Sequence, residues 1–169
     1  QHPNIQADLL EFRGMLESEA AALAARRATD ADIQRIGEAY ARVEGLFAQG
    51  PSAEVFDEQV RADLAFHQAI AEAAHNVMIG HLTASLFRVT HDHIDRNLRH
   101  LRRLEDDWQE LRGQHAAIWD AVKRRDPVAA QAAVRCHMTF VEESMLARAQ
   151  HEERESRARV TRKLVGQGA

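Results

Sequence analysis

The feature that most constrains this fold is a helical stripe over residues 56–74 that carries ionisable groups among apolar ones. Its members recur at steps of four and three residues: Phe56, Val60, Asp63, His67, Ile70 and Ala74. Such a stripe faces the core of a helical protein. Burial of an unpaired carboxylate or imidazole costs on the order of several kcal/mol. Asp63 and His67 lie one turn apart on that face, so the pattern indicates a further group that pairs with them.

The composition is typical of an all-helical protein. The 169 residues contain only three prolines and eight glycines, and aromatic residues make up 5%. This length fits one domain with a sizeable core. The single cysteine, Cys136, excludes an internal disulfide and suits a reducing compartment. We therefore predict an all-α, antiparallel bundle of six or seven helices in a cytoplasmic protein.

Hydropathy and charge exclude two classes of partner. No apolar run reaches the length of a membrane span, and no signal-peptide pattern is present. The net charge of −4 provides no basic footprint for nucleic acid on this chain. We therefore expect no membrane partner and no direct contact of these residues with DNA.

Capping and stop signals divide the chain into six helices. We expect them over about residues 5–28, 30–49, 53–75, 77–103, 105–125 and 127–150, with Thr29 as the N-cap of the second and a bend near Thr90. Asp126-Pro127, a cap followed by a first-turn proline, is the strongest of the start signals. Residues 1–150 are then one domain, and the charged segment 151–169 is predicted to be a frayed tail.

The apolar faces of the first and fourth helices predict where Arg13 lies and where two copies of the chain associate. In the first helix the predicted buried stripe contains Leu9, Phe12, Leu16, Ala20 and Leu23, with Arg13 at its edge. The fourth helix is apolar on two sides, which is typical of a helix at a dimer contact. We therefore expect a homodimer that forms through the fourth and first helices.

Two further histidines occupy core positions of other helices. His115 lies on the inward stripe of the fifth helix, and His137 lies on that of the sixth. With Asp63 and His67, three helices thus bring one carboxylate and three imidazoles inward. This donor set suits a borderline divalent ion such as Zn, Ni, Co, Fe or Mn. Without cysteine ligands it differs from the usual closed structural zinc site and leaves coordination positions for water or an acid.

Two alternatives remain open on the residues alone. A buried histidine is often only a hydrogen-bonded core residue, so the chain can also be a purely structural dimerisation module. A helical metalloenzyme that activates water is the other alternative, but no second inward carboxylate marks a general base on the metal-bearing stripes. Because His91 and His93 are two residues apart, they cannot share a helix face, and only His93 is a candidate for a pocket.

The order of several short motifs resembles one known family. They are Glu11-Phe12-Arg13, Leu16-Glu17, Arg27-Ala28-Thr29, Asp63-x-x-Phe66-His67, Asn76, Gln114-His115 and His137-Met138. Over residues 6–148 the chain resembles the C-terminal effector-binding (FCD) domain of FadR-subgroup regulators in the GntR superfamily of bacterial transcription factors. One departure is Ala74-His75-Asn76, where the family often has Gly before Asn.

The resemblance implies a ligand-sensing domain and no enzyme. Asp63, His67, His115 and His137 match the family's metal ligands, and zinc is the first expectation, with Ni, Mn, Co or Fe as others. Arg13 matches an arginine that meets the carboxylate of the effector.

The resemblance also implies partners. The central cavity is expected to bind a small metal-chelating acid, and residues around His93 and Arg96 provide a second candidate effector site. The family's N-terminal winged helix-turn-helix domain does not occur in these 169 residues. Operator DNA is therefore expected to bind only through that absent domain, whether it was removed or the chain is a stand-alone sensor.

Overall fold

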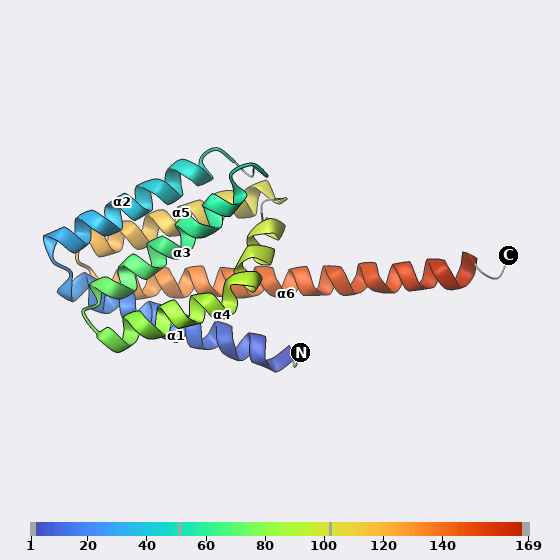
Figure 1. Ribbon diagram of the computed structural model, residues 1–169, viewed down its shortest axis with the longest axis horizontal. Coiled ribbons are helices and arrows are strands. Elements are labelled where there is room, and N and C mark those ends of the chain that lie inside the picture. The colour runs from blue at the N-terminus through green and yellow to red at the C-terminus, as the bar shows by residue number, and fades with distance from the viewer. Residues whose placement is uncertain (1–2, 51, 102, 167–169) are drawn as a thin grey trace.

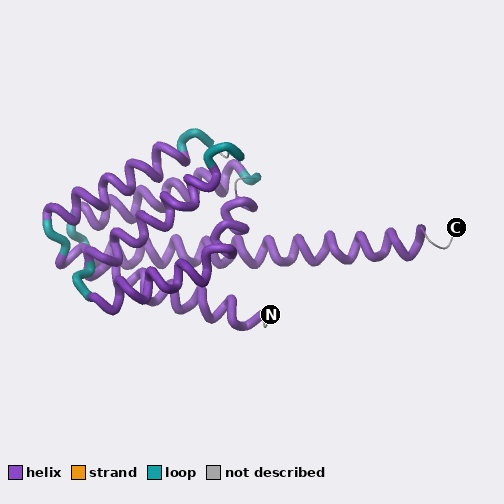
Figure 2. The backbone as a smooth tube through the Cα atoms, in the orientation of Figure 1, coloured by secondary structure: helices purple, strands orange, loops and turns teal. Residues whose placement is uncertain are grey.

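The computed structural model describes residues 3–50, 52–101 and 103–166 as helices joined by short connections (Figures 1 and 2). The helices are α1 (Pro3–Arg27), α2 (Asp30–Phe47), α3 (Phe56–Ala73), α4 (Val77–Leu101), α5 (Glu105–Lys123) and α6 (Pro127–Gly166). Within these ranges there is no strand, and no helix is long and apolar enough to cross a membrane. The all-α prediction is confirmed.

All six helices contribute to one core, in which α1 packs on α3, α5 and α6, α2 packs on α3 and α5, and α4 packs on α3, α1 and α6 (Figure 1). At one end of the core, Trp108 stacks on Phe47 with ring centroids 4.4 Å apart, and its indole N–H donates to the Phe47 carbonyl at 3.1 Å. Both side chains are fully buried. This packing fixes α5 against α2 and so sets the position of the α5 residues that point toward the centre.

The inward face of α1 differs from the predicted one. Phe12 is 40% exposed and Leu16 is only half-buried, whereas Arg13 and Glu17 are each 4% exposed. A run of buried alanines continues this face: Ala20, Ala21, Ala24 and Ala28. The prediction that Phe12 lies inside and Arg13 at the edge is therefore wrong. Small alanine side chains allow α1 to approach its neighbours closely, and the charged pair is buried because it finds partners there.

Helix α4 is bent, as the sequence predicts (Figure 1). The Thr90 hydroxyl donates to the carbonyl of Leu86 at 2.7 Å. A threonine bonded to the preceding turn in this way is a known cause of helix bending. The bend turns the second half of α4 across α6, and the two helices contact each other.

Helix α6 continues to Gly166, beyond the predicted end near Gln150, and projects from the bundle (Figure 1). The segment expected to be frayed is thus helical as far as Gly166. Its side chains over residues 151–159 are exposed, so no core packing holds it. Instead, ion pairs one turn apart join Arg157 to Glu153 at 2.6 Å and Arg159 to Glu155 at 3.3 Å. Each such pair favours the helix by about 0.3–0.5 kcal/mol.

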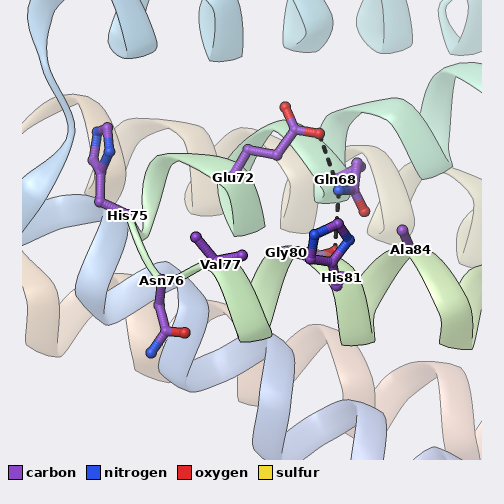
Figure 3. A pocket seen from close by; sticks show the side chains of 8 residues that line it. All are labelled: Gln68, Glu72, His75, Asn76, Val77, Gly80, His81 and Ala84. Carbon is purple, nitrogen blue, oxygen red and sulfur yellow. Dashed lines mark hydrogen bonds between the residues drawn. The ribbon is translucent and has the colours of Figure 1, made fainter.

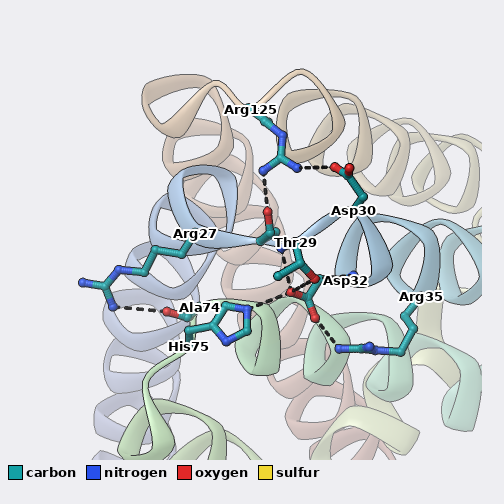
Figure 4. A network of polar contacts seen from close by, with 9 residues as sticks. Arg27, Thr29, Asp30, Asp32, Arg35, Ala74, His75 and Arg125 are labelled. Atoms are coloured by element: carbon teal, nitrogen blue, oxygen red, sulfur yellow. Dashed lines mark hydrogen bonds and ion pairs between the residues drawn. The ribbon is translucent and has the colours of Figure 1, made fainter.

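A polar network joins three interhelical connections at one end of the bundle (Figure 4). Arg125 donates to the Ala28 carbonyl and pairs with Asp30 at 3.0 Å. His75 Nε2 lies 2.7 Å from Asp32 Oδ2. Burial raises the pKa of Asp32, but bonds from Thr29 and His75 outweigh it and lower that pKa to about 2.

This network accounts for the histidine that stands where the family often has glycine. His75 has a positive φ of 49°, a conformation that is unfavourable for a residue with a Cβ. Its contact with the buried Asp32 carboxylate offsets that cost. Glycine would adopt this φ without strain. In its place, His75 forms a contact with Asp32 that links the α3–α4 connection to α2.

Candidate metal centre

Helices α3, α5 and α6 each direct one histidine to the centre of the bundle. One ring nitrogen from each of His67, His115 and His137 lies within 4.8 Å of the others. The ring centroids are 5.0 to 5.6 Å apart, and the three side chains are 1–4% exposed. The sequence prediction that these three stripes converge is confirmed. The three histidines can therefore bind one metal ion.

Asp63, the fourth predicted ligand, touches this cluster through His115. The two side chains approach to 3.0 Å between Asp63 Oδ1 and His115 Nε2, and Asp63 is 7% exposed. Burial raises the pKa of Asp63, but contact with His115 outweighs it and lowers that pKa. The carboxylate thus lies next to His115, while the group of ring nitrogens within 4.8 Å of one another contains the three histidines and not Asp63.

The histidine cluster contains nitrogen atoms without hydrogen-bond partners. Among the described residues, His67 Nε2 and His115 Nδ1 are buried and have none, whereas His115 Nε2 has the Asp63 carboxylate 3.0 Å away. An unsatisfied buried polar group costs about 1–3 kcal/mol. A divalent cation would accept the nitrogen lone pairs and complement the Asp63 charge, so the residues present fit a borderline metal ion.

Glu17 and Gln114 orient two of the rings from outside the cluster. Glu17 Oε2 lies 3.1 Å from His67 Nδ1, and Gln114 Oε1 lies 3.1 Å from His137 Nδ1 in a hydrogen bond. When Nδ1 of a ring carries its proton toward such a partner, Nε2 is left as the metal-binding atom. Metal-ligating histidines commonly have this kind of second contact.

The pKa values of His67 and His137 shift in opposite directions. Burial, followed by the charges of His67 and His115, holds the pKa of His137 well below its usual 6.5. Burial also lowers the pKa of His67, but contact with Glu17 outweighs it and the net shift is upward. Neutral imidazole is the form that binds a metal, so the lowered pKa of His137 favours that form and the raised pKa of His67 opposes it.

Arg13 lies in the centre rather than at the edge. Its Nε donates to Glu17 Oε1 at 2.7 Å, and its guanidinium is 5.3 Å from the centroid of Phe87. A cavity of about 20 Å³ is lined by Arg13 together with Asp63 and His137. That volume holds about one water molecule. A cationic side chain and two predicted ligands thus face one small cavity.

The two other predicted effector residues are separated from each other. His93 lines a second cavity of about 10 Å³ that also includes Arg13, and its buried Nδ1 has no partner among the described residues. Arg96 is exposed, donates to the Asp92 carbonyl at 3.1 Å, and lines a different groove between α4 and α6. The structure brings His93 to Arg13 but does not bring Arg96 there.

Sequence reasoning assigned no role to Glu17 or Gln114. Glu17 follows Arg13 by four residues, and that spacing is the signal of a same-face ion pair on a helix. Gln114 lies beside His115 in the chain, but its contact is with His137 on another helix. Only the tertiary structure shows this second contact.

A larger cavity of about 460 Å³ lies between the end of α3 and the start of α4, and none of the predicted ligands lines it (Figure 3). Gln68 donates its amide to Glu72 at 3.0 Å and to the Gly80 carbonyl at 3.4 Å. Within this cavity the Gln68 amide N–H groups are thus paired, while Gln68 Oε1 is buried without a partner among the described residues. The large cavity and the cluster of predicted ligands therefore lie at different places in the structure.

Relatives of known role share most of this chain. It is 33% identical over 144 residues to the Glc operon transcriptional activator of Escherichia coli (strain K12), covering 85% of this chain and 56% of that protein. It is 34% identical over 143 residues to the HTH-type transcriptional regulator LutR of Bacillus subtilis (strain 168), covering 80% and 59%. The chain is also 30% identical over 160 residues to the putative L-lactate dehydrogenase operon regulatory protein of Escherichia coli (strain K12), covering 95% and 58%.

The chain therefore spans rather more than half the length of these curated relatives. A solved structure of Streptococcus agalactiae GntR has the same fold, with a TM-score of 0.65 at 23% identity over 85% of this chain and 62% of that one. The FCD domain family matches residues 8–140. These relatives are regulators of transcription and not enzymes. The chain belongs to the FCD domain family, the helical domain of GntR-family transcriptional regulators.

Proposed function

We propose that this chain is the ligand-sensing domain of a FadR-type regulator, in which a divalent metal and a small carboxylate effector bind side by side. The observation that carries the proposal is the convergence of three buried histidines, in which His67 Nε2 and His115 Nδ1 have no partner among the described residues and His137 lines a cavity with Arg13. A purely structural core would leave those donors and acceptors unsatisfied at a considerable cost in stability.

In this proposal Asp63, His67, His115 and His137 hold the metal, with zinc as the first candidate and Ni, Mn, Co or Fe as alternatives. The ion supplies a Lewis-acidic anchor for an anionic oxygen. Glu17 and Gln114 contact Nδ1 of His67 and His137, so that Nε2 of each ring would be the atom available to the ion. Arg13 supplies a charge-assisted donor to the same anion.

A small acid fits this arrangement better than a bulky ligand. The cavities beside Arg13 measure about 20 and 10 Å³, so the site must widen even for an acid of few atoms. One relative is named for an L-lactate dehydrogenase operon, and lactate is a 2-hydroxy acid. We infer that the effector is a 2-hydroxy acid, a 2-keto acid or a citrate-like acid.

The same site does not favour the alternative of a metalloenzyme that activates water. A metalloenzyme needs a general base near the ion, and Glu17 is the one additional buried carboxylate found there among the described residues. Burial opposes ionisation, but the charge of Arg13 and contact with His67 lower the pKa of Glu17 to about 2. A carboxylate so acidic is a poor base at neutral pH.

The acid effector is expected to raise the melting temperature of the metal-bound chain. Ligand at 100 times its dissociation constant adds about 2.7 kcal/mol of stability. Thermal unfolding with lactate, pyruvate and citrate should therefore show a shift that chelation abolishes and that Arg13→Gln weakens while metal content is kept. Arg26→Gln, at an exposed arginine of the same helix, is the matched control. Acids that stabilise the metal-free chain equally well contradict the shared site.

We further propose that effector binding repositions DNA-binding domains within a homodimer, a shift between two arrangements. Operator DNA would bind through a winged helix-turn-helix domain and not through these residues. Support for the dimer comes from α4, whose Phe87 and Ile94 are buried while Leu82 and Val89 are 40% and 65% exposed. Exposed apolar side chains on one helix face favour association.

Sedimentation at micromolar concentration should therefore show dimer for the native chain. The charge-bearing variant Val89→Glu should shift it toward monomer, because a carboxylate is costly to bury in an apolar contact. Val128→Glu is the control, since Val128 is 75% exposed at the start of another helix, α6. If the native chain sediments as a monomer, α4 does not form a dimer contact, and dimerisation then depends on parts of the protein outside these residues.

A further inference from the structure

A charged groove, separate from the histidine cluster, lies between the bent second half of α4 and the middle of α6. Its volume is about 270 Å³, and it shares no lining residue with the two cavities beside Arg13. One side is lined by Arg96, Arg99 and His100 of α4 and by Arg103, which follows the helix, and the other side is lined by Arg148 and His151 of α6. Arg96 lies about one turn from Arg99 and His100, and Arg148 lies about one turn from His151, so each helix turns basic side chains to the groove.

Positive charge in this groove exceeds negative charge. Four guanidinium groups line it against two carboxylates, Glu152 and Glu155. Arg99 is neutralised by Asp95 at 2.8 Å, and His151 pairs with Glu155 at 3.3 Å. Arg103 makes no ion pair within the part of the chain that the structure describes. Arg96 and Arg103 therefore present positive charges that no ion pair among the described residues balances.

Arg148 is the buried member of the groove. It is 9% exposed, and it donates from Nη1 to Glu152 at 2.8 Å. Its Nε is buried and has no partner among the described residues. A buried N–H donor without an acceptor is costly even when another part of the guanidinium is paired, and a ligand that accepts from it recovers that cost. The pKa of His100 is lowered, first by burial and then by Arg148 and His151, which is consistent with a positive potential in the groove.

We propose that the groove between α4 and α6 binds a small phosphate-bearing anion, seated on Arg148 and flanked by Arg103 and Arg96. Guanidinium groups present planar pairs of N–H donors that match phosphoryl oxygens. A phosphate monoester is a dianion near neutral pH and so balances the surplus cations. The volume of about 270 Å³ accommodates a phosphate monoester of a few carbon atoms. This site is independent of the metal and of the carboxylate effector.

Calorimetric titration with inorganic phosphate and with glycerol 2-phosphate, at constant ionic strength, tests the proposal. The native chain should bind both saturably, and the dissociation constant should rise about tenfold or more in Arg148→Gln. The surface double variant Arg96→Gln/Arg103→Gln should weaken binding as well, and it covers the case in which Arg148→Gln does not fold. Arg154→Gln, an exposed charge change on α6 outside the groove, should leave binding unchanged.

Three outcomes would overturn the assignment. Phosphate that binds no better than acetate or chloride excludes a phosphoryl site. Binding that is lost in Arg13→Gln but kept in Arg96→Gln/Arg103→Gln places the anion at the central metal cluster instead. Binding of a short DNA duplex through these arginines, without binding of either free phosphate compound, assigns the groove to nucleic acid and not to a small ligand.

Discussion

Loss of the metal is expected to be the largest single change that this domain can undergo. The chain purified without chelator should carry close to one divalent ion, and His137→Ala should lose most of it. If the ion is present at 1,000 times its dissociation constant, its removal costs about 4.1 kcal/mol of unfolding free energy. Elemental analysis by mass spectrometry, paired with thermal unfolding before and after chelation, measures both effects.

The pH dependence of metal binding follows from the same ligands. Imidazoles must be neutral to bind, so the affinity should fall as the pH drops below about 6. His67, whose pKa is raised by Glu17, should be the first of the three to compete with a proton. His81→Ala is the control, because His81 is exposed and lines the separate cavity at the α3–α4 connection. If chelation leaves the stability unchanged and the chain binds little metal under any loading condition, the histidines are structural core residues and the chain is a dimerisation module.

Glu17→Gln is expected to be the most damaging substitution outside the four predicted ligands. The carboxylate holds Arg13 at 2.7 Å and His67 at 3.1 Å in a fully buried site. Its neutralisation leaves the Arg13 guanidinium buried without its ion-pair partner, and breaking a buried pair in this way costs about 3–5 kcal/mol. Urea unfolding at pH 7 measures the loss. Glu19→Gln, an exposed acid on the same helix that bonds to Gln131, should cost far less.

Acid should remove this difference between the native chain and Glu17→Gln. The pKa of Glu17 is lowered from 4.5 to about 2 on folding, where burial is outweighed by Arg13 and His67. A group with a depressed folded pKa contributes its stability above the unfolded value and loses it as the pH falls toward the folded value. The stability gap should therefore be full above about pH 4.5 and shrink between pH 4.5 and 2. A gap that is constant across this window would mean that Glu17 acts only through packing.

Local signals in the sequence were sufficient for the helices and for the convergence of the histidines. Each helix start or stop depends on neighbours within a few residues, as at Asp126-Pro127, and each inward stripe repeats at the helical period. An imidazole in the middle of such a stripe must point to the core wherever the helix packs. His67, His115 and His137 therefore meet because three amphipathic helices share one core.

Only the tertiary structure decided which face of α1 turns inward. The helix has apolar residues on more than one side, so periodicity favoured Phe12 and Leu16, yet packing buries Arg13 and Glu17. The cost of burying that pair is offset by partners on other helices, chiefly His67, and such partners are invisible to a pattern read along one helix.

The same limit applies to Gln114 and Arg96, whose roles depend on α6. The Gln114 bond to His137 and the placement of Arg96 in the α4–α6 groove are contacts between distant parts of the chain. The sequence by itself thus determined the helices and the inward histidines, because those depend on local spacing. The charged partners that make their burial tolerable were decided by how the helices pack, because a buried charge is stabilised by groups that are near in space and not in sequence.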